Sequence, residues 1–211
     1  MGEGELAQVV PRTVAWLERA VIGLNLCPFA KGVHVKGQIH YVVSNADSRE
    51  DLLDALRTEL RALVALDPSV RDTTLLIAPL AFPEFWDFNT FLPECDKLLK
   101  REKLQGVVQI ASFHPRFEFA GAEPEDITNY TNRAPYPILH LLREDSIDRA
   151  VQAFAQPDEI FEKNMQTLQA LGQTGWDALG LYDPHRPAPQ QPADSSPGAP
   201  PGTQPDSSGG L

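Results

Sequence analysis

With 211 residues, the chain is long enough for one domain of ordinary size and a short tail. Its formal net charge of -11 disfavours nucleic acid as a partner, because binding phosphates needs a cationic surface, and disfavours an anionic membrane surface as well. The sequence has no run of about eighteen apolar residues, so no membrane span is predicted. The acidic start does not resemble a secretory signal. With only Cys27 and Cys95, we expect a reduced, cytoplasmic protein.

The first half of the chain alternates helical and strand patterns. Apolar residues recur at helical spacing near the start, and Gly23 and Asn25 are typical of a helix stop. Short runs rich in Ile, Tyr, Val and Leu predict strands between the helices. The predicted elements are a helix over 5–24, a loop over 26–32, a strand over 38–43, a helix from Asp47 or Ser48 to before Pro68, and a strand over 73–78.

The second half continues this alternation and then places two strands in succession. Pro93 falls within the third helix, and we expect it to kink or divide that helix. The remaining predicted elements are a helix from Pro83 to Lys103, strands over 106–111 and 138–142, a short helix capped by Ser146 or Asp148, and a helix that Pro157 opens and Gly172 ends. Because Pro137 also suits the first turn of a helix, a helix over 138–142 is the alternative.

This order of elements predicts an α/β fold, with α+β as the alternative. We expect one mixed sheet of about four strands, with parallel neighbours where a helix connects them. A ferredoxin-like two-layer sandwich and a small three-layer arrangement both fit the pattern. Residues 1–182 are predicted to form the single domain, and the Pro-, Gly- and Ser-rich residues 183–211 a disordered tail.

Residues 113–119 carry several ionisable and aromatic side chains at the predicted end of the third strand, where open α/β sheets usually bind ligands. If the chain stays extended, His114, Arg116 and Glu118 share one face and three phenylalanines share the other. His114 is then a candidate general acid or base, and Arg116 a candidate anion-binding group. A half-buried edge strand with solvated charges is the alternative.

A second polar segment follows at residues 129–137. Its side chains offer amide donors and acceptors, a planar cation and a phenol, which predicts recognition of a carboxylate or phosphate. The candidate binding residues are Asn129, Asn132, Arg133 and Tyr136, with His140 two residues beyond Ile138. An ordered loop, in which the Asn side chains mimic turns and Arg133 pairs with a nearby carboxylate, fits equally well.

Cys27 is the third candidate, because a loop position could leave its sulfur accessible beside Asn25. It would act as a nucleophile or redox thiol if the fold brings a cation to it. The preceding helix ends here, so its dipole is expected to raise the thiol pKa. The alternative is that Cys27 is a small buried hydrophobe, as we expect for Cys95.

The sequence contains no motif for a metal or a nucleotide cofactor. The five histidines show no close pairing, and the two cysteines are far apart, so no metal site is predicted; a site built from distant Cys27, His114 and His140 is the remaining alternative. Glycine-rich nucleotide loops and a Gly-x-Ser-x-Gly elbow are absent from the sequence. The sequence identifies neither a cofactor nor an oligomeric state.

Four phrases, in order along the chain, resemble a known family. They are Gly23-Leu24-Asn25-Leu26-Cys27-Pro28-Phe29-Ala30, Pro83-Glu84-Phe85-Trp86-Asp87-Phe88, Ser112-Phe113-His114-Pro115-Arg116-Phe117 and residues 129–137. The chain up to Tyr182 is similar to domain-of-unknown-function family 1415. The resemblance implies no activity, cofactor or site residue.

The residues themselves suggest a cytoplasmic enzyme acting on a small anionic metabolite. Arg116 and Arg133 would hold the carboxylate or phosphate of the substrate, with His114 and Cys27 as the catalytic groups. Asn25, Asn129 or Asn132 would orient the substrate. A non-catalytic protein that binds a small anion or a metal, and a scaffold that recruits partners through its tail, are the alternatives.

Overall fold

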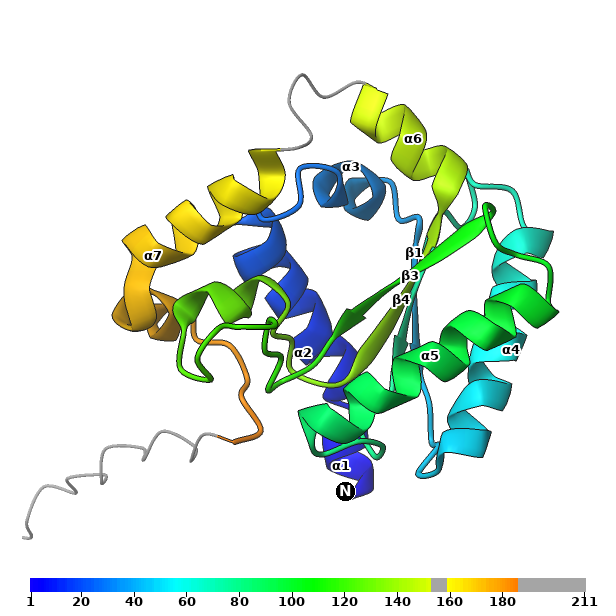
Figure 1. The fold of residues 1–211 in the computed structure, drawn as a ribbon, viewed down its shortest axis with the longest axis horizontal. Coiled ribbons are helices and arrows are strands. Elements are labelled where there is room, and N and C mark those ends of the chain that lie inside the picture. The colour runs from blue at the N-terminus through cyan, green and yellow to red at the C-terminus, as the bar shows by residue number, and fades with distance from the viewer. Residues whose placement is uncertain (153–158, 186–211) are drawn as a thin grey trace, which may run out of the picture.

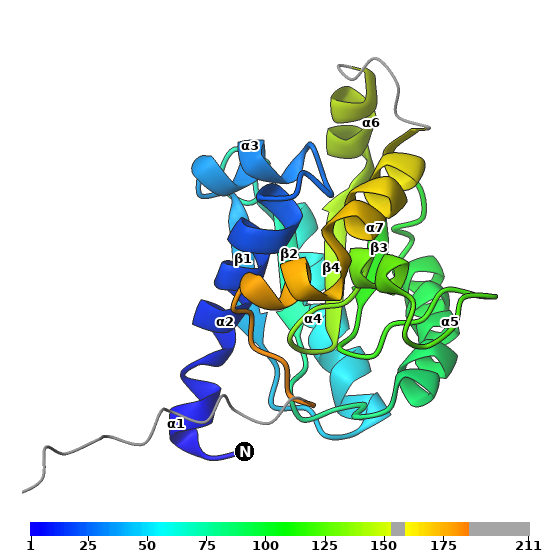
Figure 2. The same cartoon turned by 90° about the vertical axis from the view of Figure 1, so that its left-hand side faces the viewer.

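The computed structural model describes residues 1–152 and 159–185 of the chain. Four strands form one sheet in the order β1-β2-β4-β3, and helices lie on both of its faces (Figures 1 and 2). The predicted α/β class with one mixed four-stranded sheet is confirmed. Of the two predicted arrangements, the chain adopts the three-layer one, because separate apolar clusters cover the two sheet faces.

The strand connections explain the mixed sheet. β1 (Ile39–Val43) and β2 (Thr73–Ile77) are parallel neighbours, joined through α4 (Arg49–Ala65) as the helical connection predicted. β4 (Ile138–Arg143) lies between β2 and β3 (Val108–Phe113) and runs antiparallel to both. The predicted fourth strand is therefore confirmed, and it separates β2 from β3.

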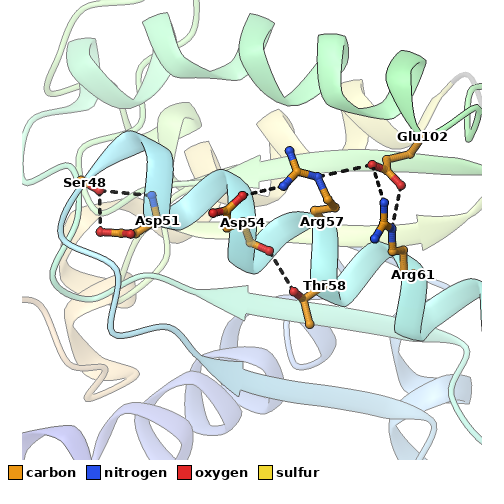
Figure 3. A network of polar contacts seen from close by, with 7 residues as sticks. All are labelled: Ser48, Asp51, Asp54, Arg57, Thr58, Arg61 and Glu102. Atoms are coloured by element: carbon orange, nitrogen blue, oxygen red, sulfur yellow. Dashed lines mark hydrogen bonds and ion pairs between the residues drawn. The ribbon is translucent and has the colours of Figure 1, made fainter.

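α4 and α5 (Phe85–Arg101) cover one face of the sheet. Ser48, one of the two predicted caps, caps α4, because its hydroxyl accepts a hydrogen bond from the Asp51 amide. On the outer side, Arg57 and Arg61 of α4 both contact Glu102, which follows α5 (Figure 3). Strand alternation turns Leu76, Val108, Leu139 and Leu141 toward these two helices.

The opposite face is covered by segments from the N-terminal and C-terminal parts of the described chain. The predicted helix over 5–24 consists of α1 (Glu3–Leu6), α2 (Val9–Trp16) and the π-helix η1 (Leu17–Ile22). Asn25 then adopts a left-handed backbone conformation with φ of 55°, consistent with the predicted stop. From the other end of the chain, residues after α7 (Ile160–Ala178) pack onto the same cluster.

Several local predictions differ from the structure. The short helix α3 (Ala30–Val35) begins within residues 26–32, which were expected to form a loop. Pro93 does not divide its helix, because α5 runs from Phe85 through Arg101. After β3 the chain does not stay extended, since a turn forms in which the Phe117 amide donates to the His114 carbonyl at 3.1 Å.

The last helices are α6 (Glu144–Gln152) and α7. α6 begins before Ser146 and Asp148, so neither predicted residue caps it. α7 continues to Ala178 past a non-helical Gly172, which was expected to end it. Pro157, expected to open the final helix, and residues 186–211 lie outside the described part of the chain. No helix in the described ranges combines the length and apolarity that a membrane crossing needs.

Candidate functional site

His114 lies in the protein interior, with none of its surface exposed. Its Nε2 donates to the Phe82 carbonyl at 2.9 Å, and its Nδ1 accepts from the Arg116 amide at 3.0 Å. Burial lowers its pKa to about 4, so the ring is neutral near pH 7. Both nitrogens are thus engaged with backbone groups, and this geometry gives His114 a structural role.

The turn after β3 separates the side chains that extended backbone would have aligned. Arg116 is exposed and pairs with Glu84, with 2.8 Å between Nη1 and Oε2. It borders an open surface hollow beside α5, whereas His114 points into the core. The predicted His-Arg-Glu face is therefore wrong, because it required a continuous strand.

The two candidate asparagines hold the loop around η2 (Ile127–Thr131) together. Buried Asn129 accepts from the Phe119 amide at 3.0 Å and donates to the Glu123 carbonyl at 2.8 Å. Asn132 donates to the Ser112 carbonyl at 3.2 Å. These bonds match the ordered-loop alternative, in which Asn side chains replace turn hydrogen bonds.

Arg133 and Tyr136 are also bound within the protein. The Arg133 guanidinium donates to the Phe117 and Pro124 carbonyls, at 3.2 and 2.6 Å, and lies over the Tyr130 ring. Its expected partner was a carboxylate, but these partners are carbonyl groups. The buried Tyr136 hydroxyl accepts from Arg12 at 3.1 Å. Arg133 lines a cavity of about 270 Å³, which Tyr136 does not line.

Cys27 lines a different and larger cavity, of about 560 Å³, on the sheet face opposite α4 and α5. We call it the sheet cavity. Burial raises the pKa of the Cys27 thiol, while the Phe29 and Ala30 backbone N–H groups oppose this rise. The direction agrees with the prediction, but burial is the main cause. At neutral pH the side chain is therefore a thiol.

The sheet cavity is bounded by strands below and by helices around it. α3 and α6 both lie at the end of the sheet where β1 begins and β4 ends (Figures 1 and 2). Alternate residues of all four strands form the floor, because successive side chains point to opposite faces. The floor consists of Ile39, Thr73, Leu75, Gln109, Ala111, Phe113, His140 and Leu142, and Trp16, Leu17, Val21, Pro28, Phe29, Ala30, Val33, Ile147 and Ala150 are among the wall residues.

His140 is the titratable side chain of this floor. Its Nε2 lies 2.6 Å from the Thr73 hydroxyl, and the same hydroxyl donates to the Leu141 carbonyl at 2.6 Å. Burial lowers the pKa of His140 to about 4. The floor therefore presents a neutral imidazole among mainly apolar side chains.

Charged groups lie in the wall of the sheet cavity. The Arg143 guanidinium donates to the Leu63, Leu66 and Arg71 carbonyls, and Asp72 accepts from the Ser146 hydroxyl at 2.6 Å. Lys36 is exposed and has no partner within residues 1–152 and 159–185. Lys36 is therefore the cation of this cavity that is available to a ligand.

The predicted site residues are not brought together. Cys27 lines the sheet cavity, Arg133 the smaller cavity and Arg116 the surface hollow, while His114 lines none of these three. Asn25 ends the first helical segment and lines none of them either. Across the part of the chain that the structure describes, no three His, Cys, Asp or Glu side chains are placed to hold a metal ion.

The sequence analysis missed Thr73 and Lys36, and it considered His140 only as a neighbour of the polar loop or as a distant metal ligand. A signal for His140 existed, because it is a polar residue at an inward position of an apolar strand. Thr73 and Lys36 gave no comparable signal, since each is ordinary in its own segment.

Comparison with known proteins agrees with the resemblance of the four phrases. No curated protein and no solved structure matches the chain. A family model described as "Protein of unknown function (DUF1415)" matches residues 8–178, which is most of the chain. The chain therefore belongs to the DUF1415 family.

Proposed function

We propose that the protein binds a small organic molecule with a mainly apolar body in the sheet cavity. The observation that carries this proposal is the cavity of about 560 Å³ with its apolar floor and walls. Small-molecule sites are typically of this size, mainly apolar, and equipped with a few polar groups that orient the ligand. Here His140, Thr73 and Cys27 are such groups.

An acidic head group fits the same proposal, which keeps the expected anionic ligand at a new position. A carboxylate at the cavity wall would meet Lys36, whereas the Arg143 guanidinium is already bound to carbonyls. Replacing Lys36 by Met should weaken the binding of 2-naphthoate about two- to fivefold, as expected for one partly solvated charge pair. The affinity for neutral 1-naphthol should not change.

The main test fills the cavity from its floor. Ala111→Phe adds a ring to β3 inside the cavity, and it should abolish the binding of 1-naphthol measured by saturation-transfer NMR. Ala65→Phe is the matched control, because exposed Ala65 lies on α4, away from the cavity. Binding that persists in Ala111→Phe, with the fold intact by circular dichroism, would refute the proposal.

A thiol-dependent enzyme is the second candidate function. It is favoured by one observation, that Cys27 and His140 line the same cavity. A small apolar maleimide should then label Cys27 and not Cys95, which is 1% exposed in the core. Saturating 1-naphthol should slow this labelling, and the rate should be compared with that of a model thiol at pH 7. Labelling slower than that of the model thiol would count against nucleophilic catalysis.

A further inference from the structure

The hydrogen bonds of the cavity floor fix where the His140 proton lies. Thr73 has one hydroxyl hydrogen, and it is donated to the Leu141 carbonyl, which can only accept. The short contact of 2.6 Å between the Thr73 hydroxyl and Nε2 must therefore be a bond that Nε2 donates. His140 is the tautomer with its hydrogen on Nε2 and a lone pair on Nδ1.

The charge state of the ring supports the same assignment. Burial lowers the pKa of His140 to about 4, and no carboxylate among the described residues opposes this effect. The ring is thus neutral near pH 7, and Nδ1 is an acceptor there rather than a donor.

Nδ1 also lacks a partner. No hydrogen bond reaches it from the described residues, in contrast to His114, where both nitrogens are bonded. In the described ranges, the side-chain polar atoms that are buried from solvent and have no hydrogen-bond partner are the Tyr41 and Thr131 hydroxyls. Nδ1 is not one of these buried atoms, and His140 lines the cavity. We therefore take Nδ1 as accessible from the sheet cavity.

We propose that Nδ1 of His140 is the hydrogen-bond acceptor that selects ligands in the sheet cavity, so that the cavity prefers molecules combining an apolar body with a neutral O–H or N–H donor. This inference rests on the proposed function and narrows its ligand class. Phenols, alcohols and indole-like amines belong to this class. A ligand without a donor would shield Nδ1 from solvent without supplying a hydrogen bond in return, and would lose affinity.

Two probes of similar shape test the preference. 1-Naphthol carries a donor, and 1-methoxynaphthalene lacks one. Wild-type protein should bind 1-naphthol about three- to tenfold more tightly, the ratio that one net hydrogen bond provides. In His140→Phe the two affinities should become equal, because the ring remains and the acceptor is lost. His40→Phe is the matched control, since exposed His40 lies on the opposite sheet face, and it should keep the wild-type ratio.

The outcomes separate the two proposals. If both probes bind the wild type equally, or if His140→Phe keeps the preference, the inference about Nδ1 is wrong and the apolar cavity still stands. If neither probe binds, or if both bind and Ala111→Phe has no effect on them, the proposed function fails, and this inference fails with it.

NMR of the wild-type protein gives a test that does not depend on the folding of a variant. The ¹⁵N chemical shifts of His140 should identify Nε2 as the protonated nitrogen and Nδ1 as the unprotonated one. Adding 1-naphthol should shift the Nδ1 resonance toward lower frequency, as expected for an acceptor, and 1-methoxynaphthalene should not. A protonated Nδ1, or an Nδ1 chemical shift that does not change at saturating 1-naphthol, would overturn the inference.

Discussion

His114 shows how one residue can suggest catalysis in the sequence and provide stability in the fold. Its ring bridges the Phe82 carbonyl and the Arg116 amide, and stacks on Phe88 with 5.4 Å between ring centroids. Phe82 has a positive φ of 53°, which an L-residue rarely adopts. The bond from His114 thus helps to hold an unfavourable backbone conformation in place.

We therefore predict that His114→Phe destabilises the protein by about 2–4 kcal/mol. The substitution keeps an aromatic ring but leaves one buried carbonyl and one amide without a partner, each costing about 1–3 kcal/mol. Urea denaturation would measure the change in the free energy of unfolding. The control His34→Phe removes only a surface contact with Glu18 and should cost about 1 kcal/mol or less. A stable His114→Phe protein would contradict the structural role.

The buried imidazole of His140 predicts how stability depends on pH. Its folded pKa of about 4 lies below the value of about 6.5 in unfolded chains, so the unfolded state binds the proton first as pH falls. The stabilisation is present above about pH 6.5 and is lost as the pH falls toward 4. From pH 7 to pH 5, the wild type should lose about 2 kcal/mol more than His140→Phe.

Comparing the two proteins isolates this contribution, because their carboxylates and other histidines are the same. Urea denaturation at both pH values supplies the four free energies needed. Equal losses in the two proteins would mean that His140 is not buried in its neutral form.

At the scale of elements, α5 shows how a local rule can be outweighed by its surroundings. Pro93 lacks an N–H group and cannot bond the Asn89 carbonyl, yet the helix continues to Arg101. Phe88, Phe91, Cys95 and Leu98 form a buried stripe on both sides of the proline. Burial of this stripe explains why the helix persists.

We predict that Pro93→Ala stabilises the protein by about 1–2 kcal/mol. Pro93 is exposed, so the substitution removes no core contact, and alanine restores the missing amide. The gain is smaller than the intrinsic penalty because proline also restricts the unfolded chain. The midpoint of urea denaturation should rise, whereas Asp96→Ala, at another exposed position of α5, should change it little. A lower midpoint for Pro93→Ala would show that the restored amide finds no hydrogen-bond partner in α5.

The elements that could be predicted are those whose signals are local. The apolar runs of all four strands and the stripe of α4 are readable over a few residues, and so is the Ser48 cap. The helix α3 is not, because Gly32 and the neighbouring Pro28 are typical of a loop. The helical connection of β1 to β2 likewise predicted their parallel pairing, but nothing local placed β4 between β2 and β3.

At the scale of the whole molecule, the candidate site could not be predicted because it forms between distant segments. Thr73 and His140 are 67 positions apart, and they meet through the register of β2 with β4. Cys27 reaches the same cavity from the N-terminal layer. Polar density along the chain favoured residues 113–119 and 129–137, and in the fold those residues mainly bond to each other and to the backbone.

The N-terminal helix α2 and the segment after α7 also contact each other in the fold. Arg12 of α2 donates to Tyr136 and lies 3.7 Å from the centre of the Tyr182 ring, which stacks on Tyr136. Leu179 and Leu181 pack on the same apolar cluster. The segment after α7 therefore packs as part of the core.

Two truncations test where the domain ends. A chain ending at His185 keeps these contacts and should unfold with the same free energy as the full chain, within about 0.5 kcal/mol, because residues 186–211 offer little apolar surface to bury. A chain ending at Ala178 loses Tyr182 and the two leucines, and it should be less stable by about 2 kcal/mol or more. Urea denaturation would compare the three chains. If the first truncation lowers the free energy of unfolding, part of residues 186–211 contributes to the folded domain. If the second truncation leaves the free energy of unfolding unchanged, the Arg12–Tyr182 contact does not stabilise the fold.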